Sequence, residues 1–260
     1  MEAKFIITGV PRSGTTFLVN SLNKLDRASV FGEICSMRGG KLNKKIHWQK
    51  EVQEQRAIKE ENSYRSWLIR YAKVPEQPDV RKFHTNELLF KFLDHTFASN
   101  NIVGFKLLAN HIDRLPATVD YIKARNIKVI HLVRKNILKT VLSGKVRKDV
   151  PFEKFKLDYG DIARKATDIQ LADIKLEKLF SGKNYLKLFY EDITEDKEIC
   201  VIPHKIGELV FNFLGLSGNG NLGVFVKRTS PDKISQRITN FKDFKEFVEE
   251  VMPEYLHMVD

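Results

Sequence analysis

The sequence predicts an α/β protein: a single domain with a central parallel sheet, helices on both faces and one helical insertion. Three observations carry this prediction. Short apolar runs that suit buried strands alternate with segments whose apolar residues recur every three or four positions, as on a helix face. No internal repeat, low-complexity tract or linker divides the 260 residues. The alternation is interrupted once, between residues 38 and 100, where helical patterns stand without strands.

The composition describes a soluble globular chain with a basic surplus. Hydrophobic residues make up 42% and charged residues 30%, which is enough apolar material for a core. The 44 Lys+Arg exceed the 33 Asp+Glu by 11, which suits a polyanionic ligand or partner such as a nucleotide, an acidic glycan, nucleic acid or an anionic membrane. Cys35 and Cys200 lack metal-ligand spacing, and two cysteines cannot make a disulfide framework, so a reducing cytosol fits, although the sequence also allows a single disulfide. No run approaches the roughly 18 apolar residues of a membrane span, and the N-terminus has no signal-peptide profile. We therefore expect a cytoplasmic protein without a transmembrane segment.

The first predicted strand leads into a loop bounded by glycines. The run Phe5–Ile7 suits one short buried strand, and apolar residues from Phe17 to Leu25 follow at helical spacing. A loop between a strand and a helix can turn successive N–H groups toward one point at the positive end of the helix dipole, which favours phosphate-like anions. The loop residues are small or polar, with one cation: Pro11, Arg12, Ser13, Gly14, Thr15 and Thr16.

The cation of this loop departs from the nucleotide-hydrolase pattern. In GxxxxGK[ST] loops the lysine after the second glycine reaches the outer phosphates. Gly9 and Gly14 have that spacing, but Thr15 occupies the lysine position and the cation stands earlier, at Arg12. A magnesium-dependent P-loop kinase is an alternative that this departure disfavours, because the charge on a γ-phosphate would lack its lysine.

Three candidate catalytic residues follow at or near strand ends. Glu33 stands near the end of the predicted strand Ala28–Ile34, beside the loop, where a carboxylate can act as general base. Lys106 interrupts the apolar run Asn101–Ala109, and an unpaired buried charge is costly, so it lies at the strand's end or has a function. His111 follows five residues later.

A second group of cations follows the clearest β-branched run, Ile127–Val133, which predicts a central parallel strand. Arg134 and Lys135 come directly after it, and Asn136 is a good N-cap for the helix that should follow. Ser143 lies two turns into that helix. A cation at the carboxyl end of a strand and a serine on the next helix can clamp one terminal phosphate.

The remaining elements are predicted from periodicity and turn residues. One helix face is formed by Tyr64, Trp67, Leu68 and Tyr71, and prolines between residues 74 and 79 break that helix. We expect further helices at Leu88–Phe97, Lys154–Phe180 and Ile202–Leu214, and a strand at Tyr185–Tyr190.

Five strings, in this order, resemble the sulfotransferase family: PRSGTT, GFKL, LVRKN with a later serine, FYEDI and KRTSP. Among its members, the chain is most similar to bacterial carbohydrate and lipopolysaccharide sulfotransferases. The resemblance implies a P-loop-like fold and 3′-phosphoadenosine 5′-phosphosulfate (PAPS) as sulfuryl donor. It also implies adenosine 3′,5′-bisphosphate (PAP) as product and no metal. The acceptor would be a hydroxyl, with a glycan or glycolipid favoured, and residues 38–100 would form a cap that carries acceptor specificity.

The resemblance also assigns roles to residues. Loop residues 11–16 would hold the 5′-phosphosulfate, with Arg12 and Lys106 stabilising the charge that develops on the bridging oxygen. Glu33 would be the base, with His111 as the alternative. Either Arg134 or Lys135, together with Ser143, would hold the 3′-phosphate. The late loop that contains Lys227, Arg228 and Thr229 would cover this phosphate, and the string ISQRITN after it would form a helix. FYEDI is interpreted as structural.

A basic module that binds nucleic acid is the alternative from another class. The surplus of cations permits it, but the sequence has no RNP-type aromatic motif, zinc finger or obvious helix-turn-helix. We therefore expect a nucleotide donor and a hydroxyl acceptor as partners rather than nucleic acid. Nothing in the sequence indicates the oligomeric state.

Overall fold

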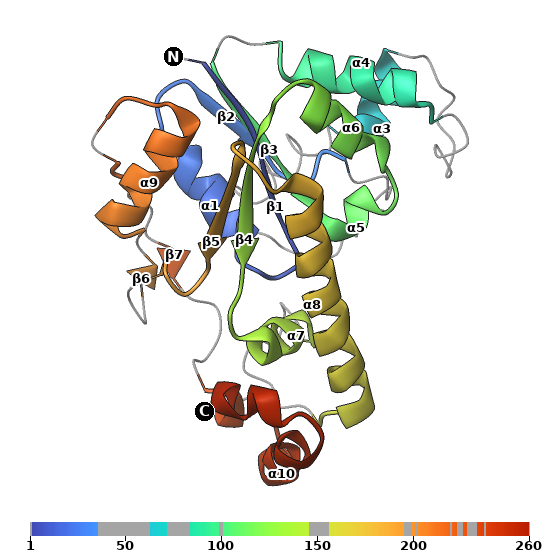
Figure 1. Ribbon diagram of the computed structural model, residues 1–260, viewed down its shortest axis with the longest axis vertical. Helices are drawn as coiled ribbons and strands as arrows, with labels where there is room; N and C mark the ends of the chain where they lie inside the picture. Colours follow the sequence, from blue (N-terminus) through green and yellow to red (C-terminus); the bar gives the residue numbers. More distant parts are fainter. Residues whose placement is uncertain are drawn as a thin grey trace, which may run out of the picture.

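The protein is described by a computed structural model whose main strands form one parallel sheet (Figure 1). The described residues are 2–35, 63–71, 84–98, 101–145, 156–194, 199–200, 202–218, 220–222, 226–227, 233–236 and 238–259. The strand order is β2-β3-β1-β4-β5, and every neighbouring pair is parallel. The strands are β1 Ala3–Gly9, β2 Ala28–Phe31, β3 Ile102–Leu108, β4 Lys128–Val133 and β5 Tyr185–Phe189. All five predicted strands and their parallel arrangement are confirmed.

Helices cover both faces of this sheet, as predicted (Figure 1). Successive side chains of β1 alternate between the two faces: Ile6 packs in one apolar cluster, and Phe5 and Ile7 pack in the other. The cluster around Ile6 includes α3, α4, α6 and α8, whereas α1 and α9 cover the opposite face. The helices are α1 Thr15–Leu22, α3 Tyr64–Arg70, α4 Asn86–Thr96, α5 Ala109–Ile112, α6 Ala117–Ala124, α7 Ile137–Lys145, α8 Tyr159–Phe180, α9 His204–Leu214 and α10 Phe241–Val251.

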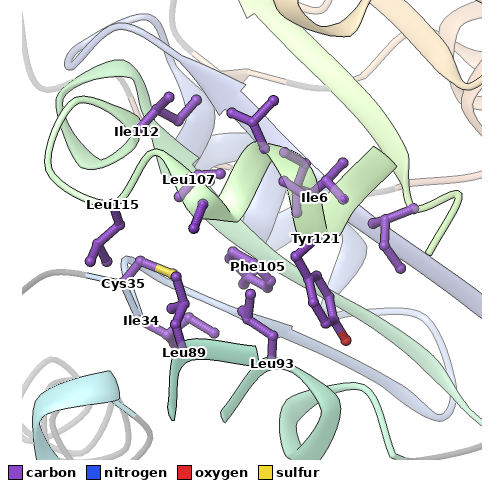
Figure 2. Packing of buried hydrophobic residues seen from close by; sticks show 14 of the residues in the cluster. Ile6, Ile34, Cys35, Leu89, Leu93, Phe105, Leu107, Ile112, Leu115 and Tyr121 are labelled. Carbon is purple, nitrogen blue, oxygen red and sulfur yellow. The ribbon is translucent and has the colours of Figure 1, made fainter. Parts of the chain in front are cut away.

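The described helices of the expected insertion belong to the core. Figure 2 shows Leu89 and Leu93 of α4 beside Phe105 of β3, and all three side chains are fully buried. Tyr64 and Leu68 of α3 are buried in the same cluster. These helices therefore form a layer on one face of the sheet. A cap that covers the site would have to come from residues 36–62 and 72–83, which lie outside the described residues, so the cap stays a prediction.

A third apolar cluster lies beyond the carboxyl end of β4, where that strand leads into α7 (Figure 1). It joins α7 and the first half of α8 to α10 and to the final 3-10 helix, Pro253–Met258. Asn136 connects this cluster to β4, because its side-chain amide donates to the Met258 carbonyl at 3.0 Å. A second, two-stranded antiparallel sheet is formed by β6 Ile199–Cys200 and β7 Val226–Lys227.

One predicted helix boundary and one predicted helix are corrected by the structure. The helix expected from Lys154 begins at Tyr159, because the Asp158 side chain caps it by accepting from the Asp161 N–H at 3.1 Å. The string ISQRITN does not form the helix that the resemblance implies: its described part is a 3-10 turn at Ile234–Gln236, followed by a bridge residue at Ile238. The helix that follows, α10, begins after Asn240.

Candidate active site

The glycine-bounded loop after β1 has a backbone that needs glycine at its last position. Gly14 is the N-cap of α1 and has φ 94°, a left-handed conformation that side chains disfavour. A Cβ atom there would also collide with the ring of Tyr190, at the end of β5. Arg12 has φ 75°, which turns the chain sharply before Ser13. The predicted strand, loop and helix are confirmed, and Tyr190 forms one wall of the loop.

The loop also holds a buried polar atom. The Oγ of Ser13 is fully buried, and among the described residues it has no hydrogen-bond partner. A buried hydroxyl without a partner is rare in folded proteins and is expected where a ligand supplies the missing bond. The chemistry of the loop thus fits a phosphate-like anion held against the start of α1.

Glu33 and Lys106 form an ion pair at the carboxyl end of the sheet. The Lys106 N–H donates to the Gly32 carbonyl at 3.2 Å, which fixes the turn after β2 beside β3. The Lys106 Nζ then lies 2.8 Å from Glu33 Oε1 and 3.1 Å from Thr16 Oγ1, at the start of α1. The Lys106 side chain is only 10% exposed. Its position inside an apolar strand is therefore explained by a partner carboxylate, because an opposite charge and hydrogen bonds offset the loss of water.

His111 stands on the other side of the same carboxylate. Its Nε2 lies 3.7 Å from Glu33 Oε2, and its side chain is 3% exposed. Its Nδ1 accepts a hydrogen bond from the Leu108 N–H at 3.4 Å, which fixes the ring at the start of α5. The structure thus brings together both candidates for the base that the sequence proposed, and it places Lys106 with them.

The predicted second anion site is connected to the first loop by a hydrogen bond between Arg12 and Ser143. Arg12 Nε donates to Ser143 Oγ of α7 at 3.0 Å, which connects the loop to the helix after β4. The Asn136 side chain accepts from the Lys139 N–H at 2.8 Å, so its predicted role as N-cap of α7 is confirmed.

Arg134 and Lys135, between which the sequence could not choose, have different surroundings. The Arg134 guanidinium lies 4.8 Å from the centre of the Tyr190 ring, the same ring that packs on Gly14. Lys135 Nζ pairs with Asp192 Oδ1 at 2.7 Å instead. Arg134 therefore shares the neighbour Tyr190 with the first loop, whereas Lys135 forms an ion pair with Asp192 after β5.

The FYEDI segment organises this junction. The Glu191 carboxylate accepts from the N–H groups of Lys135 and Asn136 at 2.9 and 3.1 Å, which caps the start of α7. Tyr190 is the residue that sequence reasoning missed, because its contact with Gly14 joins segments 176 positions apart in the chain. The resemblance in FYEDI was the available signal, but it indicated only a strand end.

The third predicted group of donor-binding residues is largely outside the described residues. Lys227 belongs to β7, where only its backbone is described, and Arg228 and Thr229 are not among the described residues. Their assignment to a 3′-phosphate stays a prediction.

Two other kinds of chemistry find no support among the residues that the structure describes. Burial raises the pKa of the Cys35 thiol to about 12, so this buried cysteine is not a thiolate nucleophile at neutral pH. No group of three His, Cys, Asp or Glu side chains that could hold a metal ion occurs within the described ranges.

No described helix has both the length and the apolar composition that crossing a bilayer requires.

Comparisons with known proteins concern the family and the fold of the chain. The family model described as "Sulfotransferase family" matches residues 4–201. No curated protein matches the chain. Among solved structures, the chain is similar to a sulfotransferase domain from the curacin biosynthetic pathway, with a TM-score of 0.51 and 14% identity over 91% of this chain and 82% of that one. At this identity, the similarity concerns the fold.

Two further solved structures have lower scores. A sulfotransferase from Alicyclobacillus acidocaldarius has a TM-score of 0.47 and 11% identity, over 100% of this chain and 97% of that one. A sulfotransferase from Mycobacterium avium has a TM-score of 0.44 and 12% identity, over 97% of this chain and 76% of that one.

Proposed function

Since the chain belongs to the sulfotransferase family, we propose that it transfers the sulfuryl group of PAPS to a hydroxyl of an acceptor. The observation that carries the proposal is the Glu33–Lys106 ion pair beside Thr16, where the anion-binding loop leads into α1. A carboxylate that can take a proton and a cation that can stabilise developing negative charge therefore stand together next to the loop. In-line transfer to a hydroxyl needs both groups.

The donor has anionic groups at both ends, and the proposal assigns a separate group of residues to each end. The loop at residues 11–16 would hold the 5′-phosphosulfate, with the Ser13 hydroxyl, the loop N–H groups and Thr15 and Thr16 as donors. Arg134 and Ser143 would hold the 3′-phosphate, with Lys227, Arg228 and Thr229 covering it. The contact between Arg134 and Tyr190, which packs on Gly14, supports Arg134 over Lys135 for this role.

The chemical step needs one proton transfer and one exchange of S–O bonds. Glu33 accepts the proton of the acceptor hydroxyl as the acceptor oxygen forms its bond to sulfur. The bond between sulfur and the bridging oxygen breaks, and its electron pair leaves with PAP. Arg12 and Lys106 stabilise the negative charge that grows on the bridging oxygen, and no metal is required.

The acceptor is proposed to be a glycan or glycolipid hydroxyl. The similarity of the PRSGTT and GFKL strings to bacterial carbohydrate and lipopolysaccharide sulfotransferases supports this class, and the surplus of 11 positive charges suits an acidic acceptor. Access to a nucleotide donor agrees with a cytoplasmic location, which is part of the proposal.

The test combines product detection with donor binding. Purified protein is incubated with PAPS and a panel of glycan, glycolipid, peptide and small-alcohol acceptors, and mass spectrometry detects sulfated products. Glu33→Ala should abolish turnover while PAP affinity, measured by titration calorimetry, stays near that of the original protein. Binding of ATP–magnesium in preference to PAP would contradict the proposal and favour a kinase. Unchanged turnover in Glu33→Ala would remove Glu33 from its role.

A further inference from the structure

We propose that His111 is a positioning residue: it holds the Glu33 carboxylate in place by donating from Nε2, and it is not the base itself. The inference rests on the proposed function, because it concerns the residue through which that reaction takes its proton. It separates the two candidates that sequence reasoning left open, Glu33 and His111.

The hydrogen bond at the far nitrogen of the ring decides the tautomer. Nδ1 accepts from the Leu108 N–H at 3.4 Å, so Nδ1 carries no proton. A neutral imidazole then has its proton on Nε2, the nitrogen that faces Glu33. In this state Nε2 can donate a hydrogen bond but cannot accept a proton. To act as a base through Nε2, His111 would need its proton on Nδ1, opposite the Leu108 N–H, where two donors would face each other.

The position of the ring is set by packed neighbours. His111 belongs to the short helix α5, and its side chain is 3% exposed. Figure 2 shows Ile112 of the same helix and Leu115 just after it in the apolar cluster that contains Ile34 and Cys35, next in the chain to Glu33. The Leu115 N–H donates to the His111 carbonyl at 2.9 Å. Rotation of the ring away from Glu33 is therefore opposed by the core.

The carboxylate is thus held from two sides. Lys106 Nζ contacts Oε1 at 2.8 Å, and His111 Nε2 lies 3.7 Å from Oε2. The second distance is longer than a hydrogen bond, but hydrogen bonds in a catalytic site often tighten when substrate binds. With Lys106 on one oxygen and His111 near the other, rotation of the carboxylate is limited and its lone pairs keep one direction. Small losses of such alignment lower rates strongly.

Two substitutions separate the two nitrogens of the ring. In His111→Asn, the side-chain oxygen can still accept from the Leu108 N–H, but the shorter side chain does not reach Glu33. In His111→Gln, the longer side chain can place its amide N–H near Glu33. Exposed His204, which lies 3.6 Å from Glu208 on α9, provides the control substitution His204→Asn. For each variant, kcat, the KM for PAPS and the pH profile of kcat are measured with an acceptor that the unaltered protein sulfates. PAP affinity and thermal stability are measured in parallel.

If the proposal is correct, His111→Asn lowers kcat about 10- to 100-fold, with PAPS KM and PAP affinity within about 3-fold of the original. Loss of a donor to the carboxylate should move the acidic limb of the kcat profile up by about half to one pH unit. His111→Gln should recover most of kcat and the original profile, and His204→Asn should change nothing.

Three outcomes would overturn the inference. Equal losses of more than about 1,000-fold in both His111 variants, with the fold and PAP affinity intact, would make His111 the base. Unchanged kcat in His111→Asn would remove it from the site. Loss of stability in both variants without a change in the pH profile would leave only a structural role.

If His111→Asn does not fold, His111→Gln decides: a shift of the acidic limb of its kcat profile contradicts the proposal. Absence of any sulfated product from the original protein would instead defeat the proposed function.

Discussion

Arg12 donates a hydrogen bond from Nε to Ser143 Oγ at 3.0 Å, although the two residues are 131 positions apart. Arg12 belongs to the loop after β1 and Ser143 to α7, the helix that follows β4. Because β4 pairs directly with β1, the carboxyl ends of both strands open at the same edge of the sheet. The two predicted anion sites are therefore in contact, and each is expected to affect the other.

The contact predicts a measurable effect of Ser143→Ala on donor binding. Removal of the hydroxyl takes away one partner of Arg12 and the donor that we propose for the 3′-phosphate. A net hydrogen bond contributes about 0.5–1.5 kcal/mol, so PAP affinity should fall about 2- to 10-fold. Titration calorimetry measures this, with Ser29→Ala on the exposed side of β2 as control. Equal affinities of both variants and the original protein would contradict the prediction.

Arg134 and Lys135 should differ sharply when each is replaced by alanine. Arg134→Ala should weaken PAP about 10- to 100-fold and adenosine 5′-monophosphate far less, because a charged hydrogen bond to the 3′-phosphate is lost. Lys135→Ala removes a half-exposed ion pair with Asp192, and such pairs contribute little, so PAP affinity should stay within about 3-fold. Calorimetry with both nucleotides decides. A larger loss of PAP affinity in Lys135→Ala than in Arg134→Ala would make Lys135 the residue that holds the 3′-phosphate.

The parallel sheet could be predicted from the sequence because each strand is a local apolar run. The runs at Phe5–Ile7 and Ile127–Val133 are bounded by glycine or by polar residues, and parallel strands buried on both faces need no polar alternation. The sequence places the start of α8 five residues too early, because apolar periodicity does not reveal that Asp158 caps the helix. Local patterns thus predict elements better than their ends.

The candidate site could be predicted as separate residues and not as contacts. Glu33, Lys106 and His111 each stand out because a charged or titratable residue follows or interrupts an apolar run. Their mutual distances depend on the register of β1, β2 and β3, which no local pattern contains. The packing of Tyr190 on Gly14 depends on the sheet order for the same reason. Long-range contacts of this kind need the fold.

Gly14→Ala should destabilise the protein more than an ordinary glycine substitution. Alanine at φ 94° is strained, and its Cβ would collide with Tyr190, so we expect a loss of about 2–4 kcal/mol in unfolding free energy. Gly215→Ala is the matched control: Gly215 has φ 74°, but a Cβ there meets only Lys128 Nζ at 3.6 Å. That variant should lose about 1–2 kcal/mol. Urea unfolding measures both, and equal losses would show that the Tyr190 contact is unimportant.

Cys35 should make the protein less stable in alkali. Burial raises the pKa of its thiol from 9.0 to about 12 in the folded protein. Between these two pH values the thiol of the unfolded chain is ionised, whereas the thiol of the folded protein keeps its proton. Unfolding free energy must then fall as pH rises above about 9, by up to about 1.4 kcal/mol per pH unit from this group. Cys35→Ala removes the effect. Its stability, measured by urea unfolding from pH 8 to 11, should decline less than that of the original protein, by about 3 kcal/mol at pH 11. If the unfolding free energies of both proteins fell equally with pH, the Cys35 thiol would be excluded as the cause of the alkaline destabilisation.

Lys106 should matter for the chemical step more than for the binding of product. Its Nζ lies between Glu33 Oε1 and Thr16 Oγ1, at 2.8 and 3.1 Å, where it can reach the sulfuryl end of a donor held by the loop. PAP lacks the sulfuryl group, so Lys106→Met should leave PAP affinity within about 3-fold while kcat falls about 100- to 1,000-fold. Methionine keeps the length and the apolar part of the side chain, which protects the packing of β3.

The Lys106 prediction is checked by a double-mutant cycle with Glu33→Gln. If Lys106 stabilises the leaving oxygen of the donor while Glu33 takes the proton of the acceptor, the loss in the double variant should be close to the product of the two single losses. Single-turnover rates with PAPS provide the comparison, and calorimetry with PAP controls for folding. A double variant hardly slower than Glu33→Gln alone would show that Lys106 acts only by holding the Glu33 carboxylate. An equal fall in PAP affinity and kcat would instead make Lys106 a binding residue for the 5′-phosphate.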